Sequence, residues 1–377
     1  MKIMKNTKNI MFGTVLGLFF TFGILGTSCS KWTQPEAEDY YTPPTQAYTD
    51  NMKDYFGSPH KEMFGWFGNW TGEGGSMGGS LMGLPDSVDF VSLWLCYGNL
   101  NQAQQNDLKA FQERGGRAYL CWTARNIGEG LTTDVMKLED GTILKYEDFT
   151  GTDEYLREHE WRAKFWGFED GTRESKLAAT VKFAKALADT CRKYNIDGYD
   201  YDMEALGDLC THEDTSLINT FFRTLIQEFA KDGRNLNIDI PGGTGWLSYY
   251  DMVADDVLRD VRYMIWQTYE LGHSGLENFF NSEYGVRGHK PHMFETVFEK
   301  SIVTATFERA VDKHYFLEQA SWVPSFGLDF KGLGAYHIEY DYPDAPDSDV
   351  KSYGVRPGVE YPHVRKAITM MNPPILK

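Results

Sequence analysis

The sequence predicts an α/β fold, because short apolar runs alternate with helical patterns from residue 60 to the end of the chain. Eight of the apolar runs have strand length, and patterns with helical spacing or turn residues stand between them. Eight strands and their connecting helices over about 320 residues fit a single (β/α)8 barrel, the TIM-barrel architecture. The chain has 377 residues, 42% of them hydrophobic, which is enough to bury the core of such a domain.

The elements follow the order that a barrel requires. We expect the eight strands at 63–70, 88–96, 117–122, 197–204, 236–241, 261–269, 302–307 and 332–340. The clearest helical patterns lie at 102–114, 174–194 and 217–230, and a closing helix is expected at 361–371.

The N-terminus has the pattern of an export signal. Lysines at 2, 5 and 8 precede an apolar run at 10–25, and Gly-Thr-Ser-Cys follows at 26–29. A cysteine after small residues resembles a bacterial lipobox, which predicts a signal peptide at 1–28 and lipidation of Cys29. Ordinary signal cleavage and an uncleaved anchor helix are the alternatives. We expect an exported protein, held by its lipid on the outer membrane or cell surface.

The region after the signal divides into two parts. Residues 29–55 are polar, contain three prolines and show no periodicity, so an extended tether is expected there. The folded domain is expected at 56–377. The formal net charge of −17 would repel phosphate backbones, which disfavours a nucleic-acid partner.

The cysteines behind the signal do not form a recognisable framework. Cys96 and Cys121 lie in apolar, strand-like runs and Cys191 lies on the apolar side of a helix, so these three are expected to be buried free thiols, whereas a disulfide from Cys210 stays open. No Cys-x-x-Cys pair and no Cys/His metal spacing is present, so we expect no metal and no cofactor.

One stretch organises the predicted chemistry. Residues 197–204 read Asp-Gly-Tyr-Asp-Tyr-Asp-Met-Glu. A strand points successive side chains to opposite faces, so Asp200, Asp202 and Glu204 should share one face about 7 Å apart. Carboxylates this close repel one another and raise at least one pKa, which keeps an acid protonated near neutral pH. A polar strand end or a metal site is the alternative, although no histidine stands beside them at ligand spacing.

This stretch resembles the active-site strand of glycoside hydrolase family 18, the chitinases and endo-β-N-acetylglucosaminidases, whose pattern is Asp-Gly-x-Asp-x-Asp-x-Glu. All five fixed positions are present. The resemblance implies that Glu204 is the acid that protonates the leaving oxygen, that Asp202 orients the substrate acetamide, and that Asp200 tunes Asp202 from deeper in the barrel. It also implies a substrate-assisted mechanism, in which the acetamide supplies the nucleophile.

The end of the sixth strand adds a second part of the resemblance. Tyr269 stands where the family places a tyrosine that bonds the acetamide carbonyl. Chitinases usually have Met-x-Tyr-Asp here, whereas Gln267 two residues before the tyrosine resembles the endo-β-N-acetylglucosaminidase branch. The alternative for Gln267 is a polar core residue that bonds the barrel backbone.

Two departures weaken a chitinase assignment. The third strand ends in Trp-Thr-Ala-Arg at 122–125, where the family often has Ser-x-Gly-Gly. Chitinases carry a tryptophan on the eighth strand below the sugar, and the matching position here is taken to be Ile338. Endoglycosidases that act on N-glycans tolerate this loss.

Other site residues are expected where strands stop, because barrel active sites lie at the carboxyl ends of the strands. Trp66, Trp122 and Glu339 are expected to contact the substrate, and aromatic residues, 15% of the chain, could serve either as core or as stacking surfaces. The pattern is lost at 124–172, a segment too rich in aromatics to be simply disordered. It could form a subsite wall for an extended glycan or a helical excursion on the barrel exterior.

These observations favour an endo-β-N-acetylglucosaminidase that cuts the β-1,4 bond between the two core GlcNAc residues of N-linked glycans. N-linked or other GlcNAc-containing glycans are therefore the expected partners. A chitinase is the second enzyme hypothesis. A catalytically idle glycan-binding protein is the third, although such proteins usually lose the acid or the orienting aspartate, and Glu204 and Asp202 are both present.

Overall fold

The computed structural model describes residues 45–73, 77–149, 153–342 and 354–373. The chain divides into Met1–Tyr48 and Thr49–Lys377, and the second unit contains the fold described below. The expected signal peptide and Cys29 lie outside the described residues. Within the described part, no helix combines the length and the apolar character needed to cross a membrane.

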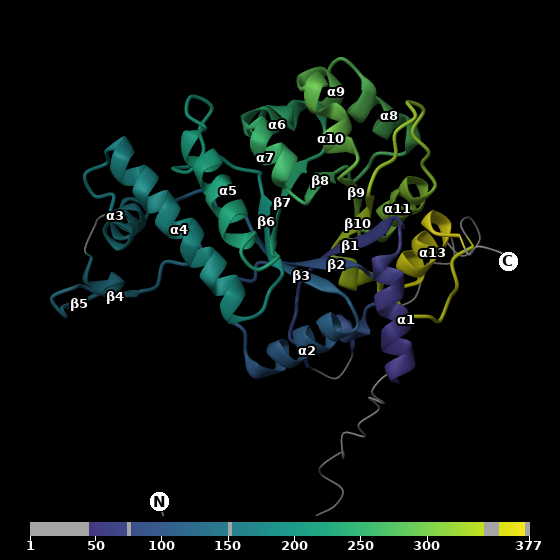
Figure 1. The fold of residues 1–377 in the computed structure, drawn as a ribbon, viewed down its shortest axis with the longest axis horizontal. Helices are drawn as coiled ribbons and strands as arrows, with labels where there is room; N and C mark the ends of the chain where they lie inside the picture. The colour runs from purple at the N-terminus through teal and green to yellow at the C-terminus, as the bar shows by residue number, and fades with distance from the viewer. Residues whose placement is uncertain (1–44, 74–76, 150–152, 343–353, 374–377) are drawn as a thin grey trace, which may run out of the picture. The chain divides into compact units, whose positions relative to one another are not determined.

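Eight parallel strands close into a barrel, which confirms the predicted (β/α)8 fold (Figure 1). Around the barrel, β1 is followed by β10, β9, β8, β7, β6, β3 and β2, and β2 pairs again with β1. The strands are β1 (Glu62–Phe67), β2 (Phe90–Trp94), β3 (Arg117–Trp122), β6 (Gly198–Asp202), β7 (Asn235–Pro241), β8 (Tyr263–Gln267), β9 (Ser301–Thr306) and β10 (Gly332–Tyr336). Several expected strands ran further, because the polar and aromatic residues after them leave the barrel as loops.

The barrel interior and its outer shell form two separate cores. Alternate residues of the strands point inward, and the inward set contains Phe64, Trp66, Phe90, Tyr119, Cys121, Tyr263, Ile265 and Ile302. The outward residues pack under the helices in a much larger cluster. At the amino end of the strands, Glu62 accepts hydrogen bonds from Arg117 and Tyr263. Burial opposes ionisation of Glu62, but Arg117 and Tyr263 outweigh it and lower the pKa of Glu62 to about 2.

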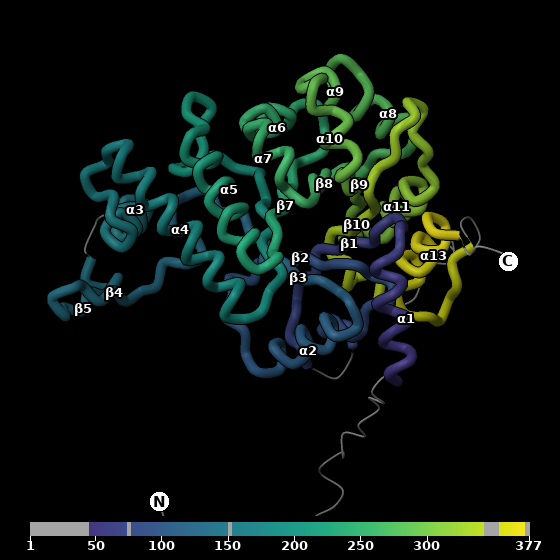
Figure 2. Tube along the Cα trace, in the orientation of Figure 1, coloured from purple at the N-terminus to yellow at the C-terminus, as the bar shows by residue number. Residues whose placement is uncertain are grey.

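The helices return the chain outside the barrel, as the trace in Figure 2 shows. The predicted helices are confirmed as α2 (Gln102–Glu113), α4 (Arg173–Lys193), α5 (Ser216–Phe229) and α13 (Pro362–Met371). Shorter helices complete the shell: α6 (Leu247–Met252), α7 (Asp255–Asp260), α8 (His273–Asn281), α9 (Val286–His289), α10 (Phe294–Phe298) and α11 (Lys313–Ala320). The extended tether was wrong for its last part, because Gln46–Gly57 form α1.

The segment at 124–172 forms a structured insert after β3. An antiparallel hairpin of β4 (Val135–Lys137) and β5 (Ile143–Lys145) is followed by α3 (Glu154–Trp166). Helix α3 packs beside α4 (Figure 1). Trp166 of α3 contacts Phe183 of α4 there. The interpretation as a helical excursion outside the barrel is confirmed for α3.

All four described cysteines are free. Cys121 and Cys191 are buried as expected, and Cys96 is half-buried. The disulfide left open for Cys210 is not formed in the described chain. Its thiol instead packs 3.5 Å from the Met252 sulfur.

Candidate active site

The glycine of the 197–204 stretch is required by the backbone. Gly198 has φ of +149°, and a Cβ at this position would lie 1.8 Å from the Asn235 carbonyl oxygen on the neighbouring strand. The two tyrosines that follow point outward. Tyr199 donates to the Trp122 carbonyl at 2.7 Å and Tyr201 to the Ala124 carbonyl at 2.8 Å, which ties β6 to the loop after β3.

The aspartates of the same stretch point into the barrel. Asp200 accepts a 2.6 Å hydrogen bond from Ser92, and Asp202 accepts one from Thr123. Both carboxyls are buried, whereas Glu204 lies beyond the end of β6 and is exposed. The shared face is therefore confirmed for the two aspartates, and Glu204 comes from the loop above them.

A fourth carboxylate, Asp239 on β7, joins this group and was missed from sequence. Asp239 stands directly beside Asp202 in the β6–β7 ladder and is fully buried. One of its oxygens has no hydrogen-bond partner among the described residues. The signal that could have found it is the alternation Asn-Leu-Asn-Ile-Asp-Ile at 235–240, which puts Asn237 and Asp239 on the inner face.

Gln267 connects three of the carboxylates. Its amide nitrogen lies 2.5 Å from Glu204 Oε1, 2.8 Å from Asp239 Oδ1 and 3.4 Å from Asp202 Oδ1. The alternative role expected for Gln267, bonding the barrel backbone, is not seen in its described hydrogen bonds. The amide has two hydrogens for three acceptors, so substrate groups can compete for one of these contacts.

Burial controls the charge of the inner acids. Burial raises the pKa of Asp200 to about 7. Burial, and then repulsion from Glu204, raises the pKa of Asp202 to about 8. Burial, followed by Asp202 and Asp200, raises the pKa of Asp239 well above its usual range. At least one acid pKa is raised, as expected, but burial rather than repulsion between the carboxylates is the leading cause for all three. The inner acids therefore hold protons to a higher pH than an ordinary aspartate does.

Aromatic rings close the space above the acids. Tyr269 follows β8 and stacks on Tyr336 at the end of β10, with ring centroids 5.9 Å apart and planes at 20°. Trp94 contacts Tyr336 edge-on at 6.0 Å. Burial, together with Asp239, Glu204 and Asp202, holds the pKa of Tyr269 well above its usual range, so Tyr269 is a hydrogen-bond donor here.

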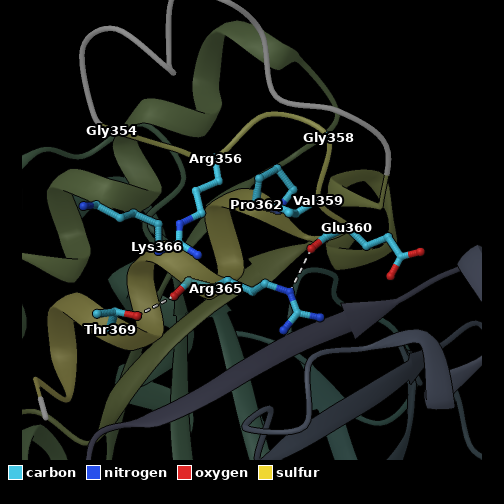
Figure 3. Close-up of a pocket in the computed structure, with 9 residues that line it drawn as sticks. All are labelled: Gly354, Arg356, Gly358, Val359, Glu360, Pro362, Arg365, Lys366 and Thr369. Carbon is cyan, nitrogen blue, oxygen red and sulfur yellow. Dashed lines mark hydrogen bonds between the residues drawn. The ribbon is translucent and has the colours of Figure 1, made fainter.

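Two cavities open at this end of the barrel. Glu204 lines a cavity of about 410 Å³ with Trp94, Tyr97, Thr123 and other residues of the loop after β3. Another of about 500 Å³ lies at the ends of β1 and β2 and shares Trp94 and Tyr97 with it. A cavity of about 810 Å³ is lined by residues between Gly354 and Thr369 and shares none of these residues (Figure 3). It therefore has no part in the carboxylate site.

The carboxylates could in principle attract a cation. Oxygens of Asp202, Glu204 and Asp239 lie within 4.8 Å of one another. However, the Gln267 amide donates into the same group, and buried acids that retain protons offer fewer lone pairs to a metal. The donor set therefore fits proton chemistry better than metal binding.

Comparisons with known proteins agree with this geometry. A family model described as "glycoside hydrolase family 18, BT1044-like" matches residues 33–160. A solved structure of selenomethionine BT1044 with a Glu-to-Gln substitution is 27% identical, with a TM-score of 0.66, over 90% of this chain and 96% of that chain. The chain is therefore similar to glycoside hydrolase family 18 proteins in sequence over residues 33–160 and in fold over most of its length.

A second solved structure is similar in fold. The apo endo-β-N-acetylglucosaminidase from Cordyceps militaris is 18% identical, with a TM-score of 0.56, over 88% of this chain and 98% of that chain. Among curated proteins, none matches the sequence.

The prediction that Ile338 occupies the position of the family's eighth-strand tryptophan is wrong. Ile338, the expected counterpart of the family's tryptophan, is fully buried in the outer core, where a Cβ on Gly65 would lie 2.5 Å from it. The inward residue at the end of β10 is Tyr336. An aromatic ring is therefore present at this end of the carboxylate site, supplied by a residue that sequence reasoning missed.

The other residues expected to contact the substrate are less exposed to solvent than predicted. Trp66 is inside the barrel, edge-on to Tyr269 and Tyr336, and supports those rings from below. Trp122 faces outward against Tyr199, with its indole N–H donated to the Glu129 carbonyl, although its edge lines the Glu204 cavity. These two tryptophans are enclosed, so their faces are not free to stack on a sugar.

Glu339 lies at the rim between β1 and the turn after β10. One carboxylate oxygen accepts from His337 at 2.7 Å and from Asn69 at 3.4 Å. The other has no hydrogen-bond partner among the described residues. Glu339 therefore has one buried acceptor oxygen that no described residue satisfies, at the edge of the carboxylate site.

Proposed function

We propose that this protein is a family 18 endo-β-N-acetylglucosaminidase that cuts the β-1,4 bond of the GlcNAc–GlcNAc core of N-linked glycans. The observation that carries the proposal is the contact of one amide, Gln267, with both Glu204 and Asp202 beside Tyr269. This places an exposed acid, a buried aspartate and a phenol donor around one point at the mouth of the barrel.

A related structure supports the choice of substrate. The Cordyceps militaris endo-β-N-acetylglucosaminidase was solved as an Asp-to-Asn and Glu-to-Gln double mutant with fucosyl-N-acetylglucosamine-Asn, and its two substituted residues stand two positions apart. Asp202 and Glu204 have the same spacing.

The first chemical step needs one acid and the substrate's own acetamide. Glu204 donates its proton to the glycosidic oxygen while the acetamide carbonyl oxygen attacks C1. The C1–oxygen bond to the leaving GlcNAc breaks, and an oxazolinium ion forms. Asp202, held by Thr123, accepts the acetamide N–H, and the Tyr269 hydroxyl donates to its carbonyl oxygen.

The second step restores the enzyme. The Glu204 carboxylate takes a proton from water, the water oxygen attacks C1, and the bond from C1 to the acetamide oxygen breaks. Because C1 is attacked twice from alternate faces, its configuration is retained. Gln267 keeps Glu204 above the inner acids through both steps.

The test is release of glycans from a glycoprotein, followed by mass measurement. Cleavage within the core leaves one GlcNAc on the protein and one on the glycan. Glu204→Gln should release none, because it cannot donate a proton. An inactive wild type, or a Glu204→Gln variant that releases glycans at the wild-type rate, would refute the proposal.

A chitinase is the second candidate, and the aromatic groove favours it. Trp70, Trp94 and Tyr97 line the cavity at the ends of β1 and β2, where a row of GlcNAc rings could pack. Cleavage of soluble chitin oligomers in preference to glycoproteins would support this activity. The idle-binder hypothesis has less support, because such proteins usually lose one of these two acids, and Glu204 and Asp202 are both present.

We also propose that the protein is exported and lipid-anchored through Cys29, on the outer membrane or cell surface. The support is the basic and apolar N-terminal sequence that ends in Gly-Thr-Ser-Cys. Labelling with a fatty-acid analogue should mark the wild type but not Cys29→Ser. Equal labelling of the two proteins would refute this anchor.

A further inference from the structure

A cavity of about 290 Å³ lies in the insert after β3. Its lining comes from the loop after β3, the insert hairpin and α3: Arg125, Asn126, Gly128, Glu129, Gly130, Thr132, Asp134, Tyr146, Tyr155, Glu158, Trp161 and Arg162. Three of these residues, Arg125, Glu129 and Gly130, also line the cavity that contains Glu204. The insert cavity, as we name it, therefore adjoins the active site across a shared wall.

The insert cavity is lined by a buried arginine, two of whose nitrogens donate no hydrogen bond to any described residue. Arg162 is 8% exposed, and its Nε and Nη2 have no hydrogen-bond partner among the described residues. Its remaining nitrogen, Nη1, lies 3.8 Å from Glu158, too far for a hydrogen bond. Burying a guanidinium without acceptors costs free energy, so this arrangement points to a ligand that brings oxygen acceptors.

The wall shared with the active site is rigidly held. Glu129 accepts from the Asn126 backbone at 2.9 Å and from the Asn126 side chain at 3.1 Å. Gly130 has φ of +81°, and a Cβ there would lie 2.7 Å from the Tyr97 ring and 2.9 Å from Trp122. The two cavities therefore keep a fixed spacing, as subsites for one branched ligand require.

The aromatic side chains supply the rest of the cavity. Tyr155 is 64% exposed, in the first turn of α3. Trp161 is buried, with its indole N–H donated to the Thr133 carbonyl at 3.0 Å, and it packs against Tyr146. An exposed ring beside buried polar groups suits a ligand with one apolar face and several hydroxyls.

The charges of the lining exclude an acidic ligand. Three carboxylates, Glu129, Asp134 and Glu158, outnumber the two guanidinium groups of Arg125 and Arg162. The chain as a whole carries a formal charge of −17. A sugar carboxylate or sulfate would be repelled, whereas sugar hydroxyls can accept from Arg162 and donate to the carboxylates.

We propose that the insert cavity is a subsite for a neutral hexose on one arm of the glycan whose core is cleaved at Glu204. Arg162 donates to its hydroxyl oxygens, and Tyr155 covers the apolar face of its ring. This inference rests on the proposed function, because it takes the arm to belong to an N-glycan. Mannose and galactose are both neutral hexoses, and the test below separates them.

Glycan binding is measured in a catalytically inactive variant, so that the test does not depend on turnover. The Glu204→Gln protein is titrated by calorimetry with free N-glycans whose arms end in mannose, galactose or sialic acid. We expect binding of a neutral-ended glycan, binding about tenfold weaker after Tyr155→Ala, and loss of binding with the sialic acid cap. Tyr284→Ala is the matched control, since Tyr284 is an exposed tyrosine outside the insert.

Activity gives a second and separable readout. In the wild-type background, Tyr155→Ala and Arg162→Lys should lower kcat/KM about tenfold on a full-arm substrate and leave a core-only substrate unchanged. The inference is overturned if Tyr155→Ala binds neutral glycans as the control does, if no neutral glycan binds, or if the sialylated glycan binds best. A wild type that cleaves neither substrate would overturn the proposed function, while the titration would still decide the subsite.

Discussion

Replacing Asp200 by Asn should make the folding stability of this protein less dependent on pH. Burial raises the pKa of Asp200 from an ordinary 3.8 to about 7, so the native carboxyl holds its proton where the unfolded chain has released it. The free energy of unfolding therefore falls as pH rises between these values, by about 1.4 kcal/mol for each pH unit. The rise of the Asp200 pKa to about 7 corresponds to roughly 4 kcal/mol of stability lost by pH 7. Asn at this position has no proton to release and removes that loss.

Other groups with raised pKa values act with the same sign, both in the site and at the amino end of the strands. Asp202 and Asp239 also have raised pKa values, so each holds a proton that the unfolded chain releases. The hydrogen bond from His60 to Asp89 raises the pKa of His60, and its contribution to stability is likewise lost as pH rises. The lowered pKa of Glu62 acts only in strong acid, below the window considered.

Denaturant unfolding between about pH 5 and pH 8 measures the effect. The wild type should lose stability steadily across this range, and Asp200→Asn should show a clearly shallower slope. Asp140→Asn is the control, because Asp140 is an exposed acid in the insert. Equal slopes for the wild type and Asp200→Asn, or a wild type whose stability rises with pH, would refute the reasoning about the buried acids.

Three further changes test the site and the barrel. Gln267→Met keeps the side-chain length but removes the amide that contacts Glu204. The kcat should therefore fall about 10- to 100-fold, with an unchanged melting temperature. Full activity of this variant would show that the amide does not contribute to catalysis. Glu62→Gln leaves the half-buried Arg117 without its counter-charge and should lower the free energy of unfolding by about 3 kcal/mol in chemical denaturation. The exposed Glu147→Gln is the control and should cause no change. Gly198→Ala should lower the free energy of unfolding by at least about 2 kcal/mol in the same assay, because its Cβ would overlap the Asn235 carbonyl. Gly245→Ala is the control, because a Cβ there meets nothing within 4 Å. Equal stability of the two variants would argue against the close approach of Gly198 to Asn235.

The barrel could be predicted because buried parallel strands are apolar along most of their length, and their runs stand out from the helices between them. The shared inner face of Asp200 and Asp202 could be predicted because alternate residues of a strand point to the same side. Asp239 was missed because it comes beside Asp202 only through the pairing of β7 with β6. The sequence of a single strand does not show which residue of the next strand will lie opposite each of its own. The insert resisted prediction because its short elements lack periodicity.

The assignment at the eighth strand failed for a local reason. Counting every second residue along β10 places Gly334 and then Tyr336 on the inner face. His337 has φ of +54°, so the chain turns there and the alternation ends. Ile338 consequently points into the outer core, although its number suggests the inner face. A turn at a left-handed residue is usually marked in the sequence by glycine, and the histidine at 337 does not mark it.

The closure of the barrel sets the order in which this chain can become native. β1 pairs with β10 along its full register, from Glu62 beside Gly332 to Trp66 beside Tyr336. Until the last strand has been synthesised, one edge of β1 has unpaired backbone groups and the inner acids lack one side of their enclosure. Contacts this distant along the chain form slowly, and partly closed barrels expose strand edges that favour aggregation. Truncation at the C-terminus should therefore yield an aggregating chain rather than a smaller barrel, since the last strand is what joins the first to the rest.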